Sequence, residues 1–208
     1  MKLSLQEKIE EISLLSFSRQ GFNETSTSEI AKCAGVSETS IFRIFKTKQD
    51  LYIHVLEKYG SKANLDYNLI FSEITFDDIN LDLKVIVDSY FNFYFDNIHI
   101  TRIYISNAIQ FQELLGFNYL IFPQLRDFME KYFKEMSTRG FIHEKASIQL
   151  TDLITSSILQ DVALLTTFEK LEKLDNETKT KLDQKWNKTI IELGKIYGWI
   201  KPGDTLHE

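Results

Sequence analysis

The sequence predicts an all-α protein, and three observations lead to this prediction. Its 208 residues include only two prolines and eight glycines, which is sparse for the many turns of a β architecture. Apolar residues recur at helical spacing over most of the length. Several of these stretches follow a serine or threonine placed to cap the first turn of a helix.

The composition is that of a globular protein, since 43% of the residues are hydrophobic and 26% are charged. The one cysteine, Cys33, cannot form an internal disulfide, which favours a reducing compartment, and we expect it to be a small buried residue. No stretch approaches the roughly 18 apolar residues of a membrane span, and the N-terminus does not resemble a signal peptide. We therefore expect a cytoplasmic protein without a membrane partner.

The formal net charge of −6 is unevenly distributed. Residues 1–50 contain seven lysines and arginines against seven acidic residues, so the negative charge belongs to the remainder of the chain. Residues 1–50, the head of the chain, thus have no net charge, whereas the rest is acidic. This difference favours the head as the part that approaches the phosphates of a nucleic acid.

A pair of short helices is expected near the N-terminus. A Ser-x-x-Glu capping box at Ser26 opens the first, which Gly35 ends, and Ser37 caps the second over residues 38–45. Two short helices joined by a glycine-containing turn are typical of a helix-turn-helix. Residues 1–47 are therefore predicted to form a three-helix helix-turn-helix domain.

Longer helices are expected on both sides of this pair. One covers residues 5–19 and ends at Gly21, a residue typical of helix C-termini. Another starts after Thr47 and connects to a second domain, so that residues 48–208 form the larger helical domain. The helix over 80–97 is apolar on nearly every face, which places it at the centre of that domain. The other long helices expected there are 99–115, 123–136, 145–168 and 177–197.

Residues 8–56 resemble the DNA-binding domain of the tetracycline-repressor (TetR) family. The resemblance includes the Phe-x-x-Lys entry into the fourth helix, whereas the rest of the chain shares only the family's pattern of long helices. It implies a C-terminal helical domain that binds a ligand and dimerises, with no cofactor. The matching residues are Ile9 through Phe17, Gly21, Phe22, Thr25, Thr27, Ile30, Ala31, Ala34 through Ser37, Ile41, Phe42, Phe45, Lys48 and Leu51.

The resemblance implies that residues 38–45 form a recognition helix, which reads base edges in the major groove of double-stranded DNA. Arg43 can bind guanine O6 and N7 with two hydrogen bonds, so we expect it to read a base. Ile41, Phe42 and Phe45 are expected to form the buried side of this helix. The predicted DNA-binding set, which includes phosphate contacts at helix N-termini, is Thr27, Ser37, Thr39, Ser40, Phe42, Arg43, Lys46 and Lys48.

A series of aromatic side chains in the C-terminal part is a candidate effector pocket. Aromatic residues at helical spacing are also typical of an ordinary core, and this alternative stays open. As a group they suggest a pocket for a flat or apolar small molecule, oriented by tyrosine hydroxyls and an asparagine. The predicted lining is Tyr90, Phe93, Tyr94, Tyr104, Asn107, Phe111, Phe128 and Tyr132.

The last two long helices carry apolar stripes that could pack internally or across a dimer interface. The resemblance implies a homodimer built from these two helices. Asp161 is expected to be partly exposed or paired in the dimer, with contact to a cationic effector as the alternative. The predicted interface is Leu150, Ile154, Ile158, Asp161, Val162, Leu165, Leu182, Trp186, Ile190, Leu193 and Tyr197.

The resemblance implies a transcriptional regulator, a repressor by family habit, which leaves a palindromic operator when a small apolar or aromatic effector binds. No catalytic motif occurs, and the fragments His54-x-x-Glu57 and Asp96-x-x-His99 do not complete a metal site.

Three positions depart from the family pattern. Thr39 stands where glycine is usual, Phe42 where tyrosine is common, and Ile44 where an aromatic or polar residue is more frequent. These departures leave open the alternative of the same fold with a degenerate head that acts as a protein-interaction module. An all-helical enzyme that uses the aromatic cavity is a further alternative.

Overall fold

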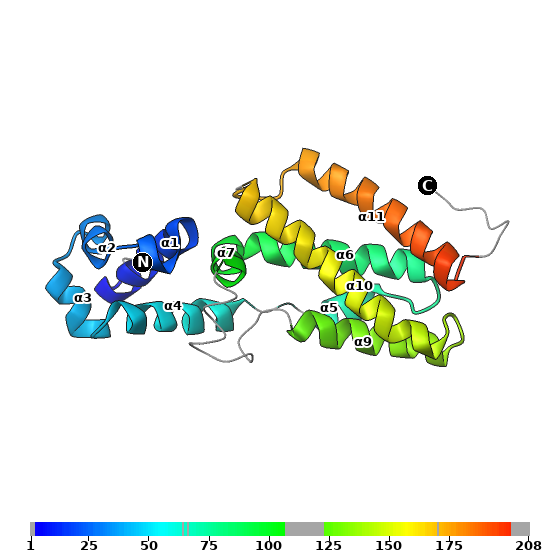
Figure 1. Cartoon of the computed structure of the whole chain (residues 1–208). Coiled ribbons are helices and arrows are strands. Elements are labelled where there is room, and N and C mark those ends of the chain that lie inside the picture. The colour runs from blue at the N-terminus through cyan, green and yellow to red at the C-terminus, as the bar shows by residue number, and fades with distance from the viewer. Residues whose placement is uncertain (1–2, 64, 66, 107–122, 170, 201–208) are drawn as a thin grey trace. The chain divides into compact units, whose positions relative to one another are not determined.

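The computed structural model describes residues 3–63, 65, 67–106, 123–169 and 171–200. All secondary structure in these ranges is helical, as the sequence predicts, and no strand occurs among them. None of the helices so described is both long and apolar enough to cross a membrane. The elements are α1 (Leu5–Glu24), α2 (Thr27–Ala34), α3 (Glu38–Phe45), α4 (Lys48–Lys62), α5 (Tyr67–Glu73), α6 (Ile79–Asp96), α7 (Ile98–Ser106), α9 (Pro123–Thr138), α10 (Glu144–Ala163), the π-helical turn η2 (Leu164–Phe168) and α11 (Asn176–Tyr197) (Figure 1).

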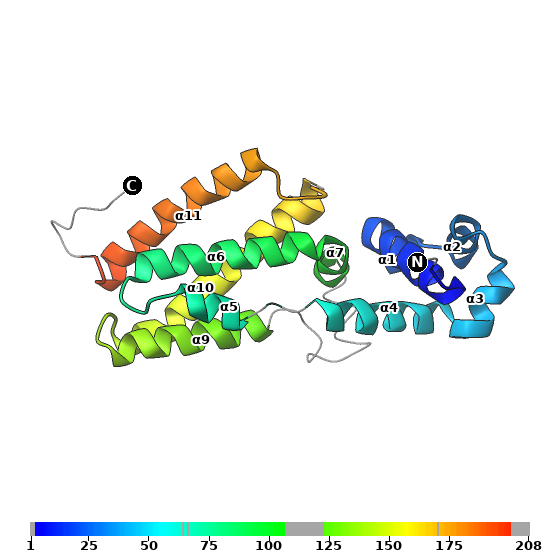
Figure 2. The ribbon, with the colours of Figure 1, turned by 180° about the vertical axis from the view of Figure 1, so that it is seen from behind.

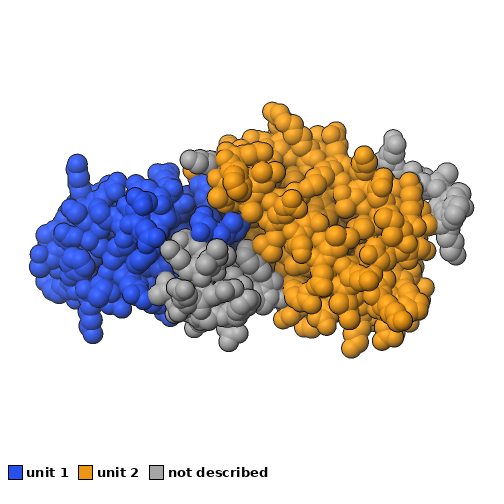
Figure 3. Space-filling view, in the orientation of Figure 1, with its two compact units in different colours: residues 1–64, 97–121 blue, residues 65–96, 122–208 orange. Residues whose placement is uncertain are grey.

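The chain divides into two compact units (Figure 3). Unit 1 comprises residues 1–64 and 97–121, and unit 2 comprises residues 65–96 and 122–208. Helix α4, which we expected to connect the domains, belongs to unit 1, as does α7. The predicted domain boundary between residues 47 and 48 therefore differs from the division of the chain into packed units. It stays a prediction about which part of the chain binds DNA and which part binds the effector.

Helix α1 begins at a complete capping box. The Ser4 hydroxyl accepts from the backbone N–H of Glu7 at 3.2 Å, and the Glu7 carboxylate accepts from the backbone N–H of Ser4 at 2.8 Å. At Gly21 the backbone leaves helical geometry, with φ of 83°, where the sequence predicts the end of the helix. The chain then makes one more turn to Glu24, because the Thr25 hydroxyl donates to the Gly21 carbonyl at 2.7 Å.

Helices α1, α2, α3, α4 and α7 all contribute side chains to an apolar core in unit 1. Ile9, Ile30, Ile41 and Leu51 have no exposed surface, and each comes from a different helix among the first four. Cys33 does not join this core but is exposed, contrary to expectation, because two-turn α2 buries only Ile30, Ala31 and Ala34. Ile41 and Phe45 fix the position of α3, the predicted recognition helix, by packing into this core.

Unit 2 is built around α6, which contacts α5, α10 and α11, as Figure 2 shows from behind. Ten of its eighteen residues are buried, so the prediction of a central helix is confirmed. One of the ten is Asp82, whose carboxylate accepts hydrogen bonds from the backbone N–H groups of Thr75 and Phe76 and from the Tyr132 hydroxyl at 3.1 Å. The segment expected as one helix over 145–168 is α10 followed by the π-helical turn η2.

Candidate functional site

The candidate DNA-contacting surface is built on the turn between α2 and α3. The Ser26 hydroxyl accepts from the backbone N–H of Glu29 at 3.0 Å and so caps α2. Gly35 ends the helix in a left-handed conformation, with φ of 68°, and Val36 N–H donates to the Ala31 carbonyl at 3.0 Å. Only glycine adopts this conformation without strain, which explains why the turn is so short.

Helix α3 starts immediately after this turn. The Ser37 hydroxyl accepts from the backbone N–H of Ser40 at 3.2 Å, and the two hydroxyl oxygens lie 2.8 Å apart. Ser37 and Ser40, both predicted to contact DNA, are thus held together at the N-terminal end of the helix.

The two faces of α3 differ as a recognition helix requires. Ile41 has no exposed surface and Phe45 is 6% exposed, whereas Thr39 and Arg43 are exposed. Phe42, which we placed on the buried side, is 38% exposed, so that part of the prediction is wrong. The stripe that faces the core consists of Ile41, Ile44 and Phe45 at helical spacing, and Phe42 lies at its edge.

A hydrogen bond that the sequence analysis missed joins the starts of α2 and α3. The Thr27 hydroxyl, on the first residue of α2, donates to the carboxylate of Glu38, the first residue of α3. Both residues are half-buried. Local sequence signals identify each helix start but not the contact between them, because the two residues meet only when the turn folds.

Lys46 and Lys48, the two predicted phosphate contacts after α3, have different surroundings. Lys46 is exposed at the end of α3, with φ of 52° and ψ of −52°. Lys48 is half-buried, and its ammonium group donates to the Asn23 carbonyl at 3.2 Å and lies 4.5 Å from the centroid of the Phe22 ring. Lys48 therefore also fastens α4 to the end of α1.

The aromatic residues predicted to line an effector pocket are divided between the two units. Tyr90, Phe93, Tyr94, Phe128 and Tyr132 are buried in unit 2. The ring centroids of Tyr90 and Tyr94 lie 6.4 Å apart, and those of Tyr90 and Phe128 lie 6.3 Å apart. Burial raises the pKa of the Tyr90, Tyr94 and Tyr132 hydroxyls, so that they stay protonated and able to donate.

The other members of that predicted set lie elsewhere. Tyr104, on α7, is part of the core of unit 1, where a Cβ placed on Gly60 would be 2.7 Å from its hydroxyl oxygen. Asn107 and Phe111 lie outside the described residues. A pocket that combines all eight residues is thus not assembled within the part of the chain that is described.

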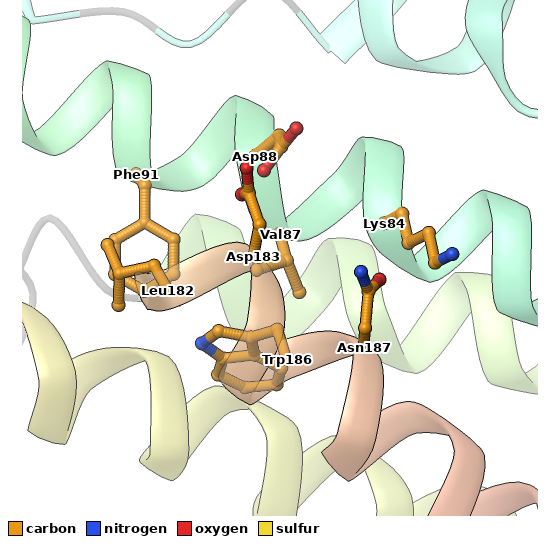
Figure 4. A pocket seen from close by; sticks show the side chains of 8 residues that line it. All are labelled: Lys84, Val87, Asp88, Phe91, Leu182, Asp183, Trp186 and Asn187. Carbon is orange, nitrogen blue, oxygen red and sulfur yellow. The ribbon is translucent and has the colours of Figure 1, made fainter. Parts of the chain in front are cut away.

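A cavity of about 220 Å³ lies between α6 and α11 in unit 2 (Figure 4). The Asp88 and Asp183 carboxylates point toward one another on one side, and Phe91 and Trp186 form part of the wall. Burial, followed by the neighbouring Asp183 carboxylate, raises the pKa of Asp88. No local sequence pattern indicates this cavity, because the residues that line it come from helices far apart in the sequence.

The residues predicted to form the dimer interface lie mostly inside the protomer. All of them except the half-buried Tyr197 are buried within the chain. Asp161 accepts hydrogen bonds from the indole N–H of Trp186 at 3.1 Å and from the ammonium group of Lys185, both on α11 of the same chain. The stripes that we assigned to a partner thus hold α10 and α11 on their own unit, since a core and an interface require the same helical spacing.

The two histidines in the fragments of metal motifs have protein partners. His54 Nε2 lies 2.6 Å from a carboxylate oxygen of Glu10, and His99 Nδ1 lies 3.1 Å from the Ser18 hydroxyl. Both contacts lie within unit 1 and join helices that are distant in sequence. These contacts give each histidine a role in packing.

Comparisons with known proteins agree with this geometry. Residues 14–55, which contain the helix-turn-helix, match the family model described as bacterial regulatory proteins, tetR family. A curated relative, the uncharacterized HTH-type transcriptional regulator YvkB of Bacillus subtilis, is 28% identical over 141 residues, which are 67% of this chain and 71% of that protein.

Two solved structures have the same fold. The ketosteroid transcriptional regulator KstR2 of Mycobacterium tuberculosis has a TM-score of 0.69 at 15% identity, with 92% of this chain and 95% of that chain covered. A TetR-like transcriptional regulator from Rhodococcus sp. RHA1 has a TM-score of 0.63 at 13% identity, with coverage of 92% and 99%. Residues 14–55 are therefore identified as the helix-turn-helix domain of the tetR family of bacterial regulatory proteins, and the chain shares the fold of the two solved regulators.

Proposed function

We propose that the chain is a homodimeric repressor that binds a palindromic DNA operator and leaves it when a small molecule binds unit 2. The observation that carries this proposal is the exposed polar and basic face of α3, with Thr39 and Arg43, opposite a fully buried anchor at Ile41. A helix presented in this way can enter the major groove without losing its contacts with the core.

The exposed residues take different roles in this proposal. Arg43 binds a guanine edge through two hydrogen bonds, and Thr39 contacts a neighbouring base or phosphate. Phe42, being 38% exposed, packs against a thymine methyl group. Lys46 and the hydroxyls of Ser37 and Ser40 bind phosphates, which position the helix without reading sequence.

The dimer forms through the outer face of the last two helices. The apolar side chains exposed there include Phe168, which is 76% exposed, and Ile196, which is 71% exposed. Burial of such side chains against a partner is favourable, so a group of them on neighbouring elements is a candidate interface. The exposed apolar residues of α10, η2 and α11 are Ile148, Leu153, Leu164, Phe168 and Ile196.

The effector is a small apolar or aromatic molecule that binds among the aromatic side chains of unit 2. The Tyr90 and Tyr94 hydroxyls, which burial keeps protonated, supply donors for a polar group of the ligand. The ligand acts through its different affinity for the DNA-bound and released states, a coupling of about 1–3 kcal/mol.

The experiment that tests the proposal is binding of the purified protein to the DNA that flanks its own coding sequence, measured by fluorescence anisotropy at two salt concentrations. We expect tight, salt-sensitive binding to one short palindrome. Arg43→Ala should weaken binding about tenfold, whereas Arg19→Ala, which removes an exposed arginine from α1, should have little effect. Weak binding that is indifferent to sequence would instead favour a head that binds another protein.

A further inference from the structure

We propose that Glu38 is a specificity-determining residue that selects cytosine at one position of each half-site. This inference rests on the proposed function, because it concerns how the recognition helix chooses among DNA sequences. The observation behind it is the hydrogen bond from the Thr27 hydroxyl to the Glu38 carboxylate, which joins the first residue of α2 to the first residue of α3.

This bond places a negative charge where DNA phosphates are expected. The N-termini of α2 and α3 each carry a partial positive charge and unpaired backbone N–H groups, which attract anions. Here the Glu38 carboxylate is bound at the start of α2 through Thr27. A DNA phosphate that approaches the N-termini of α2 and α3 is therefore repelled by the Glu38 carboxylate as well as attracted by the helix ends.

The bond also occupies a predicted phosphate contact. A threonine hydroxyl has one proton to donate, and in Thr27 that proton is donated to Glu38. Thr27 can donate to a phosphate only if Glu38 gives up the bond. Binding to the DNA backbone alone is thus opposed both by charge repulsion and by the loss of a hydrogen bond.

A base edge can compensate for this cost. A carboxylate accepts about four hydrogen bonds, so Glu38 keeps acceptor capacity beyond the bond from Thr27. In the major groove, cytosine presents the N4 amino group as a donor, whereas guanine presents the acceptors O6 and N7. Adenine also has an amino group, but its N7 acceptor lies beside it and repels a carboxylate. Cytosine is therefore the base that Glu38 accepts best.

The test starts from duplexes that the wild-type protein selects out of a pool with a randomised core. In the selected duplex, each cytosine is replaced in turn by a pyrimidine analogue that lacks the N4 amino group. The wild-type protein should lose about tenfold in affinity at one cytosine of each half-site. Glu38→Ala should show no such loss at that position, and its affinity for a scrambled duplex should rise.

Three further variants sharpen the interpretation. Glu38→Gln should prefer adenine at the same position, because an amide pairs with adenine N6 and N7. Thr27→Ser keeps the hydroxyl and should keep the cytosine preference, whereas Thr27→Val should weaken it. Glu57→Ala removes an exposed carboxylate from α4 and should leave the preference unchanged.

The outcomes distinguish this inference from the proposed function. If the wild-type protein selects no sequence, the proposed function fails, and this inference fails with it. If the wild-type protein selects a sequence but Glu38→Ala loses as much affinity as the wild type at every replaced cytosine, only this inference is overturned. Thermal unfolding of each variant measures the effect of the substitution on stability separately. If the bond between Thr27 and Glu38 only fastens α2 to α3, the variants should lose stability while their base preference stays unchanged.

Discussion

Glu10 on α1 and Lys58 on α4 form an ion pair whose carboxylate is buried and whose ammonium group reaches solvent. The side chain of Glu10 is 1% exposed, and that of Lys58 is 25% exposed. His54 and Gln6 complete the surroundings of the carboxylate, with contacts of 2.6 Å and 3.0 Å. A buried charge is tolerated only when it is paired in this way, so this cluster fastens α4 to α1.

Glu10→Ala should therefore destabilise the protein by about 2 kcal/mol. This loss of unfolding free energy is at the lower end of what breaking a buried ion pair costs, because Lys58 and His54 can still reach water. Urea unfolding followed by circular dichroism measures this difference. Glu11→Ala, which removes the exposed neighbouring carboxylate, is the matched control and should change stability by less than about 0.5 kcal/mol. Equal effects of the two substitutions would show that the cluster does not stabilise unit 1.

The same cluster makes stability depend on pH. Burial raises the pKa of Glu10, but hydrogen bonds from Lys58, Gln6 and His54 lower it further than burial raises it. Because the folded-state pKa is depressed, this contribution to stability is present above the ordinary glutamate pKa of 4.5 and is lost as the pH falls through the folded-state pKa. The difference in unfolding free energy between wild type and Glu10→Ala should therefore shrink as the pH is lowered through that range.

The local signals of the sequence predict the helix-turn-helix well. The caps at Ser26 and Ser37 and the left-handed glycine at Gly35 depend on neighbours within a few residues, and all three appear where expected. The contact between Thr27 and Glu38 depends on the folded turn, and no local pattern contains it.

The helical stripes of unit 2 fit two different environments. Ile158 and Ile190 were predicted to lie in a dimer interface, but both are buried within the chain. Their spacing fits either case, because a core and an interface both select apolar residues at the helical period. Tyr104 illustrates a related limit, since its aromatic character did not reveal that α7 packs within unit 1. Which face of a helix meets which neighbour is decided by the tertiary arrangement.

The backbone at Lys46 is strained, and this strain can be tested separately from its charge. Thr47 N–H donates to the Phe45 carbonyl at 2.5 Å across a γ-turn with positive φ at Lys46, a conformation that costs about 1–3 kcal/mol for a residue other than glycine. Lys46→Gly should therefore raise the unfolding free energy by about 1 kcal/mol. Lys46→Gln, which removes the charge but keeps the strain, should not.

Both substitutions at Lys46 should weaken DNA binding alike. Each removes one phosphate contact, so the salt dependence of the affinity should fall by about one ion in both variants. Anisotropy titrations over a range of salt concentrations measure this slope. A slope equal to that of the wild type in both variants would mean that Lys46 does not contact phosphate.

The outer face of α11 and the turn η2 should determine whether the protein dimerises. Phe168→Glu and Ile196→Glu place charges on exposed apolar positions, so they should yield folded monomers. Leu81→Glu is the control, because Leu81 is 55% exposed on α6 and lies outside the proposed interface. Ile190→Glu should instead lower stability, since Ile190 is 1% exposed and the charge would be buried. Sedimentation and circular dichroism distinguish these cases, and an unchanged dimer in both outer-face variants would contradict the proposed interface.

Gly60 allows α4 and α7 to approach one another closely. A Cβ at this position would be 2.7 Å from the Tyr104 hydroxyl oxygen, but 3.7 Å from the ring carbon that bears it. Alanine within a helix is favoured over glycine by about 1 kcal/mol, whereas overpacking a core costs about 1–3 kcal/mol. Since Tyr104 is only 3% exposed and cannot easily move, we expect Gly60→Ala to destabilise the protein.

The double variant Gly60→Ala with Tyr104→Phe isolates the cause. Removing the hydroxyl leaves the new methyl group at an ordinary contact distance from the ring, so the double variant should be more stable than Gly60→Ala alone. The comparison requires the single variant Tyr104→Phe, because the hydroxyl has interactions of its own, and the four unfolding free energies form a double-mutant cycle. A coupling near zero in this cycle would mean that the approach of α4 to α7 is set by residues other than these two.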